Sequence, residues 1–252
     1  MPESPSMPEG ASGGDAAPDG FGSTEWSMVL EASSDGGRAL DRLCRAYWRP
    51  VYVFIRASGV PRDEAEDATQ DFFTDMLERE WLKLADRERG SFRAFLRGSV
   101  NFFVCNRRRR ASALKRGGGG IVLSLDTDEC ERELASQPAD SVDPALLYEQ
   151  SWADCVIEAA VARLASEQAH AGKARVFERL RGFLTDAPTA GDYEKIASEF
   201  TVTTGQVAVW VHRLTRRFAE IIRAEITQTV ADRREVEAEL RHLLHLVARK
   251  TG

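Results

Sequence analysis

The side chains of this sequence best suited to bind a charged ligand are arginines that recur at helical spacing and end in a run of four. Those expected on one side of a helix are Arg93, Arg97, Asn101 and Arg108. The run at the end of that helix consists of Asn106, Arg107, Arg108, Arg109 and Arg110. Guanidinium groups bind phosphate oxygens well, so this pattern predicts a surface for the backbone of a nucleic acid.

An acidic stripe is expected on the helix that precedes the arginines. Its members, which recur every three or four positions, are Asp67, Asp71, Asp75 and Glu78. Beside it, an apolar face consists of Ala65, Ala68, Phe72 and Met76. An acidic face repels phosphates, so the expected partner is a basic protein surface. Such stripes are more often solvated helix faces, and the nearby aromatic residues are more often core than base-stacking groups.

A second pattern typical of DNA binding lies in the C-terminal half. Two short segments, 192–200 and 204–218, have apolar residues at helical spacing and are separated by a tight connection. This spacing predicts a helix-turn-helix, with a plain helical hairpin as the alternative. The residues that its second helix and N-terminal end should expose are Thr203, Thr204, Gln206, Trp210, Arg213 and Arg217.

Length and charge bound the class of protein. The chain has 252 residues, of which 29% are charged and 43% apolar, as in a globular protein of one or two domains. The net charge of −6 predicts that any DNA contact uses local patches and that a larger partner supplies much of the affinity. No apolar run approaches about 18 residues and no signal-peptide pattern is present, so we expect a cytoplasmic protein without membrane contact.

Catalysis and metal binding find little support in the sequence. The four cysteines are far apart in the chain and fit reduced thiols: Cys44, Cys105, Cys130 and Cys155. His242 and His245 share one helix face without a third ligand nearby, so we expect them to face solvent. No phosphate loop or nucleophile motif occurs, and we expect neither an enzyme nor a bound cofactor or metal.

Composition divides the chain into segments. We expect a disordered tail over 1–23, a helical domain over 24–116, a flexible linker over 117–143 and a second helical domain over 144–252. A helix over 38–57 contains Pro50, which should kink or reset it. The tail from about Glu225 should pack on its own domain or offer a helix to a partner.

Several of these blocks resemble the sigma-70 family of bacterial transcription initiation factors, in its extracytoplasmic-function branch. The residues similar to the second conserved region of that family are Asp67, Thr69, Gln70, Phe72, Phe73, Arg89 to Arg93 (RGSFR), Phe95, Leu96 and Asn106 to Arg110 (NRRRR). Those similar to the fourth region are Phe177 to Leu180, Phe183, Leu184, Tyr193, Ile196, Ala197, Val211 to Leu214 and Arg216 to Phe218.

The resemblance implies an all-α fold, with a region 2-like bundle and a region 4-like helix-turn-helix joined by a flexible linker. It implies that core RNA polymerase is bound through Asp67, Gln70, Asp71, Asp75 and Glu78. Residues implied to hold and open the −10 promoter element are Asp86, Arg87, Arg89, Arg93, Arg97, Asn101, Asn106, Arg107, Arg108, Arg109 and Arg110. Those implied to contact the −35 element are Thr203, Thr204, Gln206, Trp210, His212, Arg213, Arg216 and Arg217.

Some questions stay open at the level of sequence. The turn carries Thr201 where the family usually has glycine, so we expect this turn to be strained or differently shaped. Ala208 and Trp210 stand where lysine and a small residue are more typical, which puts the −35 preference in doubt. The segment 83–91 is either a base-capturing loop or an ordinary connection. An anti-sigma protein, a regulatory kinase or the C-terminal tail could each control such a factor. The alternative function is a helix-turn-helix transcriptional regulator that acts without polymerase.

Overall fold

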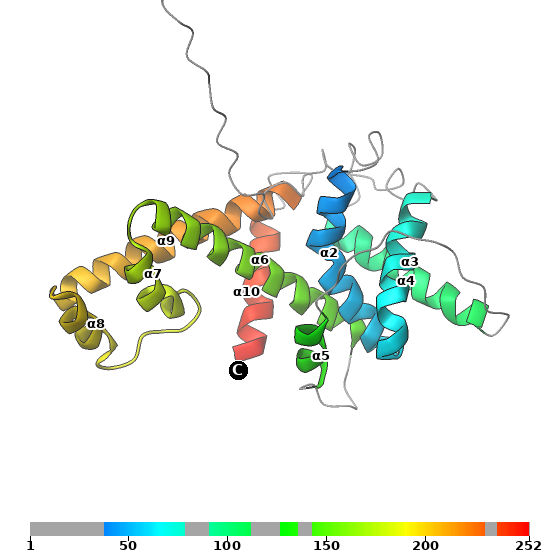
Figure 1. The fold of residues 1–252 in the computed structure, drawn as a ribbon, viewed down its shortest axis with the longest axis horizontal. Helices are drawn as coiled ribbons and strands as arrows, with labels where there is room; N and C mark the ends of the chain where they lie inside the picture. Colours follow the sequence, from blue (N-terminus) through cyan, green and yellow to red (C-terminus); the bar gives the residue numbers. More distant parts are fainter. Residues whose placement is uncertain (1–37, 79–90, 112–126, 136–142, 230–235, 252) are drawn as a thin grey trace, which may run out of the picture.

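The computed structural model describes residues 38–78, 91–111, 127–135, 143–229 and 236–251, and every regular element within these ranges is helical. In chain order the helices are α2 (Arg38–Ala57), α3 (Arg62–Glu78), α4 (Phe92–Ala111), α5 (Asp128–Ala135), α6 (Pro144–His170), α7 (Ala174–Leu180), a 3-10 helix (Arg181–Leu184), α8 (Asp192–Phe200), α9 (Thr204–Thr229) and α10 (Val236–Thr251). Figure 1 shows α2 to α5 at one end, α7 and α8 at the other, and α6 and α9 running between them. The described chain is all-α, as expected.

Aromatic side chains of α2, α3 and α4 form the first of two hydrophobic cores. Tyr47 meets the ring of Phe92 edge-on with 5.3 Å between centroids, and Phe72 meets Phe103 in the same way at 5.6 Å. All four rings are buried, and Phe95 packs at the margin of the cluster. The expectation that these aromatic residues are core rather than base-stacking groups is confirmed.

The second core lies where α7, α8 and the first half of α9 pack against the second half of α6. Its buried side chains include Phe177, Leu180, Ile196, Val207 and Leu214. Three residues separate α8 from α9, so the two helices and the tight connection predicted over 192–218 are confirmed. The second helix continues to Thr229 without interruption.

The two cores are not separated at Pro144, because α6 contributes to both. Asp143 caps α6 by accepting a hydrogen bond from the Ala145 amide at 2.9 Å, and Pro144 occupies the first turn. Tyr148 and Trp152, in the first half of α6, are buried in the core with α2, whereas Leu164 belongs to the second core. The domain limits 24–116 and 144–252 stay a prediction, and the helix α6 spans both packing units.

Part of the expected linker is folded. Within 117–143, residues 128–135 form α5, and Glu131 of this helix accepts hydrogen bonds from Tyr52 and Arg56 at 2.7 and 2.6 Å. Cys130 is fully buried against α2. The prediction of a flexible linker is wrong for this stretch, since short polar sequences can fold when their few apolar and charged groups find partners elsewhere.

Pro50 was expected to kink or reset the helix over 38–57. The helix α2 has these limits and runs through Pro50, so it is not reset there. A proline inside a helix removes a hydrogen bond and costs about 3 kcal/mol. Burial of the neighbouring Tyr47 and Val51 in the first core offsets this cost.

The remaining expectations for the ends and loops fall largely on other parts of the chain. The N-terminal tail 1–23, the first residues of the expected domain (24–37) and residues 83–90 lie outside the described residues. The last helix, α10, packs against α6 and α9, which agrees with the expectation that the tail folds onto its own chain. Among the described helices, none combines the length and the apolar character that a membrane crossing requires.

Candidate nucleic-acid and protein-binding surfaces

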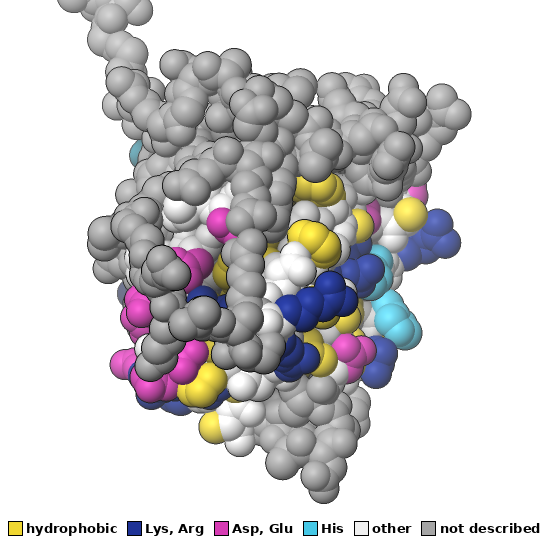
Figure 2. Space-filling model, turned by 90° about the vertical axis from the view of Figure 1, so that its right-hand side faces the viewer, with side chains coloured by type: hydrophobic (Ala, Val, Ile, Leu, Met, Phe, Trp, Pro, Cys, Tyr) yellow, Lys and Arg dark blue, Asp and Glu magenta, His cyan; other side chains and the backbone are white. Residues whose placement is uncertain are grey.

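The acidic stripe lies on the outer side of α3. Its inner side is fixed by Ala65, Ala68 and Phe72, which are all fully buried. Asp67 and Asp71 are therefore turned to the surface. Gln70 and Asp75 are half-buried, and the side chain of Glu78, the last residue of α3, lies outside the described part. In Figure 2, which views this end of the molecule, acidic side chains gather at the lower left and basic ones at the centre and right.

An ion pair joins the acidic stripe to the arginine run. Arg107 donates from Nη1 to Asp71 Oδ2 at 3.0 Å, and its Nη2 lies 3.6 Å from Glu64 Oε2. The side chains of Arg107 and Asp71 are both partly exposed, at 32% and 49%. Different partners were predicted for the two charged surfaces, a nucleic acid for the arginines and a basic protein surface for the carboxylates. At this position they share an edge.

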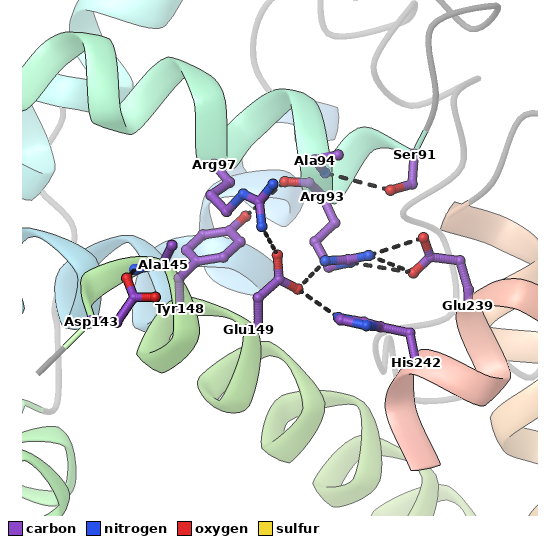
Figure 3. A network of polar contacts seen from close by, with 10 residues as sticks. All are labelled: Ser91, Arg93, Ala94, Arg97, Asp143, Ala145, Tyr148, Glu149, Glu239 and His242. Carbon is purple, nitrogen blue, oxygen red and sulfur yellow. Dashed lines mark hydrogen bonds and ion pairs between the residues drawn. The ribbon is translucent and has the colours of Figure 1, made fainter. Parts of the chain in front are cut away.

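Arg93 is the clearest departure from the expected basic face, because only 7% of it is exposed. Its guanidinium donates to both carboxylate oxygens of Glu239 on α10, with Nη2 2.9 Å from each and Nε 3.3 Å from Oε2. Nη1 donates to Glu149 of α6 (Figure 3). The guanidinium also stacks 4.7 Å above the ring centroid of Trp152. The expectation that Arg93 lines an open surface is wrong for this conformation, because carboxylates distant in sequence enclose it.

Arg97 takes part in the same network. Its Nη1 donates to Glu149 Oε1 at 2.8 Å, and 43% of the side chain is exposed. Glu149, which is 4% exposed, thus lies between two arginines, and it also contacts His242 Nε2 at 3.2 Å. Burial lowers the pKa of His242, with the positive charge of Arg93 acting in the same direction. His242 was expected to face solvent and is instead half-buried in this cluster.

The far end of α4 is more open. Asn101, Arg108 and Arg109 are exposed, while Asn106 is half-buried. Arg108 donates to the backbone carbonyl of Ser58, at the end of α2. The Arg110 side chain and the loop with Asp86, Arg87 and Arg89 lie outside the described residues.

Sequence reasoning missed an exposed ring on this part of α4. Phe102 is 57% exposed beside Asn101. It falls outside the periodic seam that contains Leu96, Val100 and Phe103. This position outside the seam could have predicted that the Phe102 ring is exposed. An exposed ring next to arginines suits stacking on an unpaired base.

Reciprocal hydrogen bonds cap the N-terminus of α9. The Gln206 amide donates to Thr203 Oγ1 at 3.2 Å, and the Thr203 amide donates to Gln206 Oε1 at 3.0 Å. This capping box satisfies two amides at the helix end and occupies both side chains. Thr203, Thr204 and Gln206 are all exposed, as expected, but Thr203 and Gln206 hold the helix end rather than point freely outward.

Two residues predicted on the recognition face of α9 have partners on neighbouring helices. Trp210 is half-buried and meets Phe200 of α8 edge-on, with 6.0 Å between ring centroids. Arg217 donates from Nε and Nη2 to the two oxygens of Glu167 on α6, each at 2.8 Å, and this pairing lowers the pKa of Glu167. The expectation that Trp210 is exposed is therefore wrong, because its ring packs on α8. Arg217 is paired with α6, although 43% of its side chain is exposed.

The outer face of α9 presents a different set of side chains. Thr204, His212, Arg213 and Arg216 are exposed, and Arg216 donates to Glu220 at 3.3 Å. Between them lies Val209, which is 47% exposed and was not predicted as a site residue. Val209 is four residues from Arg213, a spacing that places both on one face of a helix, and this could have predicted Val209 as part of the outer face.

The turn before α9 is strained at Thr201. This residue has φ 54° and ψ 49° and is the one non-glycine residue with positive φ in the described chain. A β-branched residue in the left-handed region costs free energy that glycine would not. The expectation that this turn is strained by a threonine in place of glycine is consistent with this geometry.

Comparison with known proteins adds no assignment: no protein-family model, no curated protein and no solved structure matches this chain. Within the described residues, no group of three or more histidine, cysteine, aspartate or glutamate side chains could hold a metal ion.

Proposed function

We propose that this chain is a transcription initiation factor of the sigma type, which binds core RNA polymerase and directs it to promoters. The observation that carries the proposal is the outer face of α9, where Thr204, Val209 and Arg213 are exposed on a helix whose N-terminus is capped. A helix of this kind fits the major groove, where an arginine pairs with guanine and an apolar group meets the thymine methyl.

The acidic and basic helices supply the second part of the proposal. Asp67 and Asp71 on α3 are exposed carboxylates suited to a basic surface on the polymerase. Asn101, Arg108 and Arg109 on α4 are exposed groups suited to the strands of the −10 element. The residues around the first core would thus act at −10, and those around the second core at −35. The resemblance of the sequence blocks to the sigma-70 family supports this division.

Promoter opening in this proposal draws on binding energy. Unstacking a base pair costs a few kcal/mol, and each base that stacks on an aromatic ring regains about 1–3 kcal/mol. Phe102, whose ring is exposed, would stack on such a base, and the arginines beside it would hold the strand. No catalytic group is needed for this step.

The test is in vitro transcription from DNA upstream of the gene that encodes the chain, with core polymerase and with or without the protein. We expect a specific transcript only when both are present. Arg213→Ala should reduce it about tenfold, because one base contact contributes about 1–3 kcal/mol. Arg132→Ala is the matched control, since Arg132 is exposed on α5, where it donates to the backbone carbonyl of Asp128. Absence of a protein-dependent transcript contradicts the proposal.

A second candidate is a helix-turn-helix regulator that acts without polymerase. The observation that favours it is the enclosure of Arg93, since one of the arginines assigned to −10 is already occupied while the face of α9 is open. A gel shift with the protein alone separates the two functions. Tight, salt-dependent duplex binding without polymerase supports the regulator, and weak binding that polymerase strengthens supports the initiation factor.

A further inference from the structure

We infer that α10 is a built-in inhibitor of the basic side of α4, and that Glu239 occupies the position on Arg93 that a phosphate of the DNA strand would take. The inference rests on the proposed function, because it concerns the same arginines. Its structural basis is the network of Figure 3, where α4, α6 and α10 meet.

The chemistry of the contact is that of a phosphate site. A guanidinium binds carboxylate and phosphate through the same paired N–H donors. Glu239 takes the Nε and Nη2 donors of Arg93, and Glu149 takes Nη1. With both glutamates in place, Arg93 offers no guanidinium nitrogen to a second anion. Arg97, which also pairs with Glu149, keeps a partly exposed side chain.

The net charge of this side-chain cluster also supports inhibition by α10. Two guanidiniums, of Arg93 and Arg97, face two carboxylates, of Glu149 and Glu239, so the closed cluster is neutral. Removing Glu239 leaves one net positive charge on this side of α4. A neutral cluster attracts a polyanion weakly, and a positive one attracts it more strongly at low salt.

The two glutamates differ in how firmly they are held. Glu149 lies on α6 between Tyr148 and Trp152 of the first core, so it stays with α4 in any folded state. Glu239 lies on α10, whose Val236, Leu243 and Leu246 are buried in the margin of the first core. The main contacts of α10 are with α6 and α9, whereas α2, α3 and α4 pack mainly on one another and on α6, so they keep that packing when α10 leaves. The helix α10 is therefore the movable part of the contact.

The apolar side of α10 keeps the isolated chain closed. Detachment would expose to water three aliphatic side chains that are buried in the closed form, which is unfavourable. It would also uncover the ring of Trp152, on which Arg93 stacks and near which the His242 ring lies at 6.5 Å between centroids. The open form is thus a minor state of the free protein.

Two pairs of variants on the full chain test the inference. Leu243→Asp places a charge in the buried side of α10 and should detach it, whereas Leu244→Asp, one residue away, changes a side chain that is 66% exposed. Glu239→Gln removes the carboxylate charge that faces Arg93. Glu237→Gln removes an exposed carboxylate of the same helix, one that pairs with Arg223. Circular dichroism checks that each variant is folded.

Two measurements are made on each variant. Amide hydrogen exchange over residues 236–251 reports whether α10 has detached, independently of any DNA. Fluorescence anisotropy with a labelled 20-nucleotide single strand of mixed sequence reports binding by α4, at several salt concentrations. We expect Leu243→Asp to raise exchange in α10 and to tighten strand binding at least threefold. The slope of log affinity against log salt concentration should steepen by about 0.7 for each further phosphate that the opened face neutralises.

The outcomes separate the inference from the proposed function. Glu239→Gln should tighten strand binding in the same direction as Leu243→Asp, and both controls should match the parent chain. If Leu243→Asp detaches α10 while all variants bind the strand equally, α10 does not mask α4 and the inference is overturned, with the proposed function intact. If no variant binds the strand even with α10 detached, both fail.

Discussion

Arg107 of α4 donates a hydrogen bond to Asp71 of α3, with 3.0 Å between Nη1 and Oδ2, so the predicted nucleic-acid and polymerase surfaces meet in one ion pair. Both side chains are partly exposed, and such a pair contributes at most about 1 kcal/mol to stability. The ion pair matters for the choice of residues to mutate. A change at Asp71 also alters the state of Arg107, so it cannot separate the two surfaces.

Asp67 gives a cleaner test of the polymerase surface. It is exposed on α3, and within the described ranges no ion pair ties it to an arginine of α4. Asp67→Arg should weaken binding to core polymerase at least tenfold, because it replaces attraction by repulsion at a basic surface. The affinity is measured by anisotropy of labelled protein titrated with core enzyme. Asp186→Arg, the same change in the exposed loop 185–191, should bind like the parent, and equal weakening by both would refute the assignment.

Glu131 should make stability depend on pH. Its hydrogen bonds with Arg56, and then with Tyr52, hold the pKa of Glu131 below its ordinary value. A carboxyl with a depressed folded-state pKa contributes stability above its unfolded pKa of about 4.3, and the contribution is lost as pH falls through the folded value. Glu131→Gln should therefore destabilise the chain by about 1–3 kcal/mol at pH 7, and the difference from the parent should shrink below about pH 4.

Chemical denaturation of parent and variant across this pH range measures the effect of Glu131→Gln. Asp128→Asn is the matched control on α5, because Asp128 pairs with Arg62 at 2.7 Å but is 76% exposed. We expect it to change the free energy of unfolding by less than about 1 kcal/mol at any pH. A pH-independent loss for Glu131→Gln would mean that packing, rather than charge, explains its contribution.

Thr201 offers a stabilising substitution. Its left-handed conformation costs about 1–2 kcal/mol for a side chain with Cβ, and Thr201→Gly removes that cost. Glycine loses more entropy on folding, so the expected net gain is about 1 kcal/mol or less, a rise in Tm of about 2–4 °C. Thr185→Gly is the control, because Thr185 has φ −113° and ψ −31° and gains nothing from glycine. Scanning calorimetry of both variants decides, and a fall in Tm for Thr201→Gly would contradict the prediction.

Local patterns in the sequence were sufficient for the features that depend on neighbours in the chain. The limits of α2 followed from apolar spacing, and the burial of Phe72, Phe92 and Phe103 followed from their seam. The capping residues Thr203 and Gln206 were picked out as exposed at the start of α9, although their bonding to each other was not foreseen.

Long-range pairing could not be predicted in the same way. Glu239 is 146 residues from Arg93, and no periodicity links them. Helical spacing showed correctly that Arg93 lies away from the Phe92 and Leu96 seam, but it could not show that α6 and α10 cover that side as well. The same limit explains α5, whose charged residues find their partners on α2 and α3.

The last prediction concerns Val209 and the DNA recognition that we propose for α9. An exposed apolar side chain in the major groove recognises thymine through its methyl group, and replacing thymine by deoxyuridine removes that methyl without altering pairing. Deoxyuridine at the contacted position should weaken binding of the parent chain severalfold, and Val209→Ala should weaken it by a similar factor on thymine but lose sensitivity to deoxyuridine. Arg216→Ala is the control, since it should weaken binding while keeping that sensitivity. A deoxyuridine scan of the bound duplex, read by gel shift, measures both effects, and a Val209→Ala protein as sensitive as the parent would exclude Val209 from the groove.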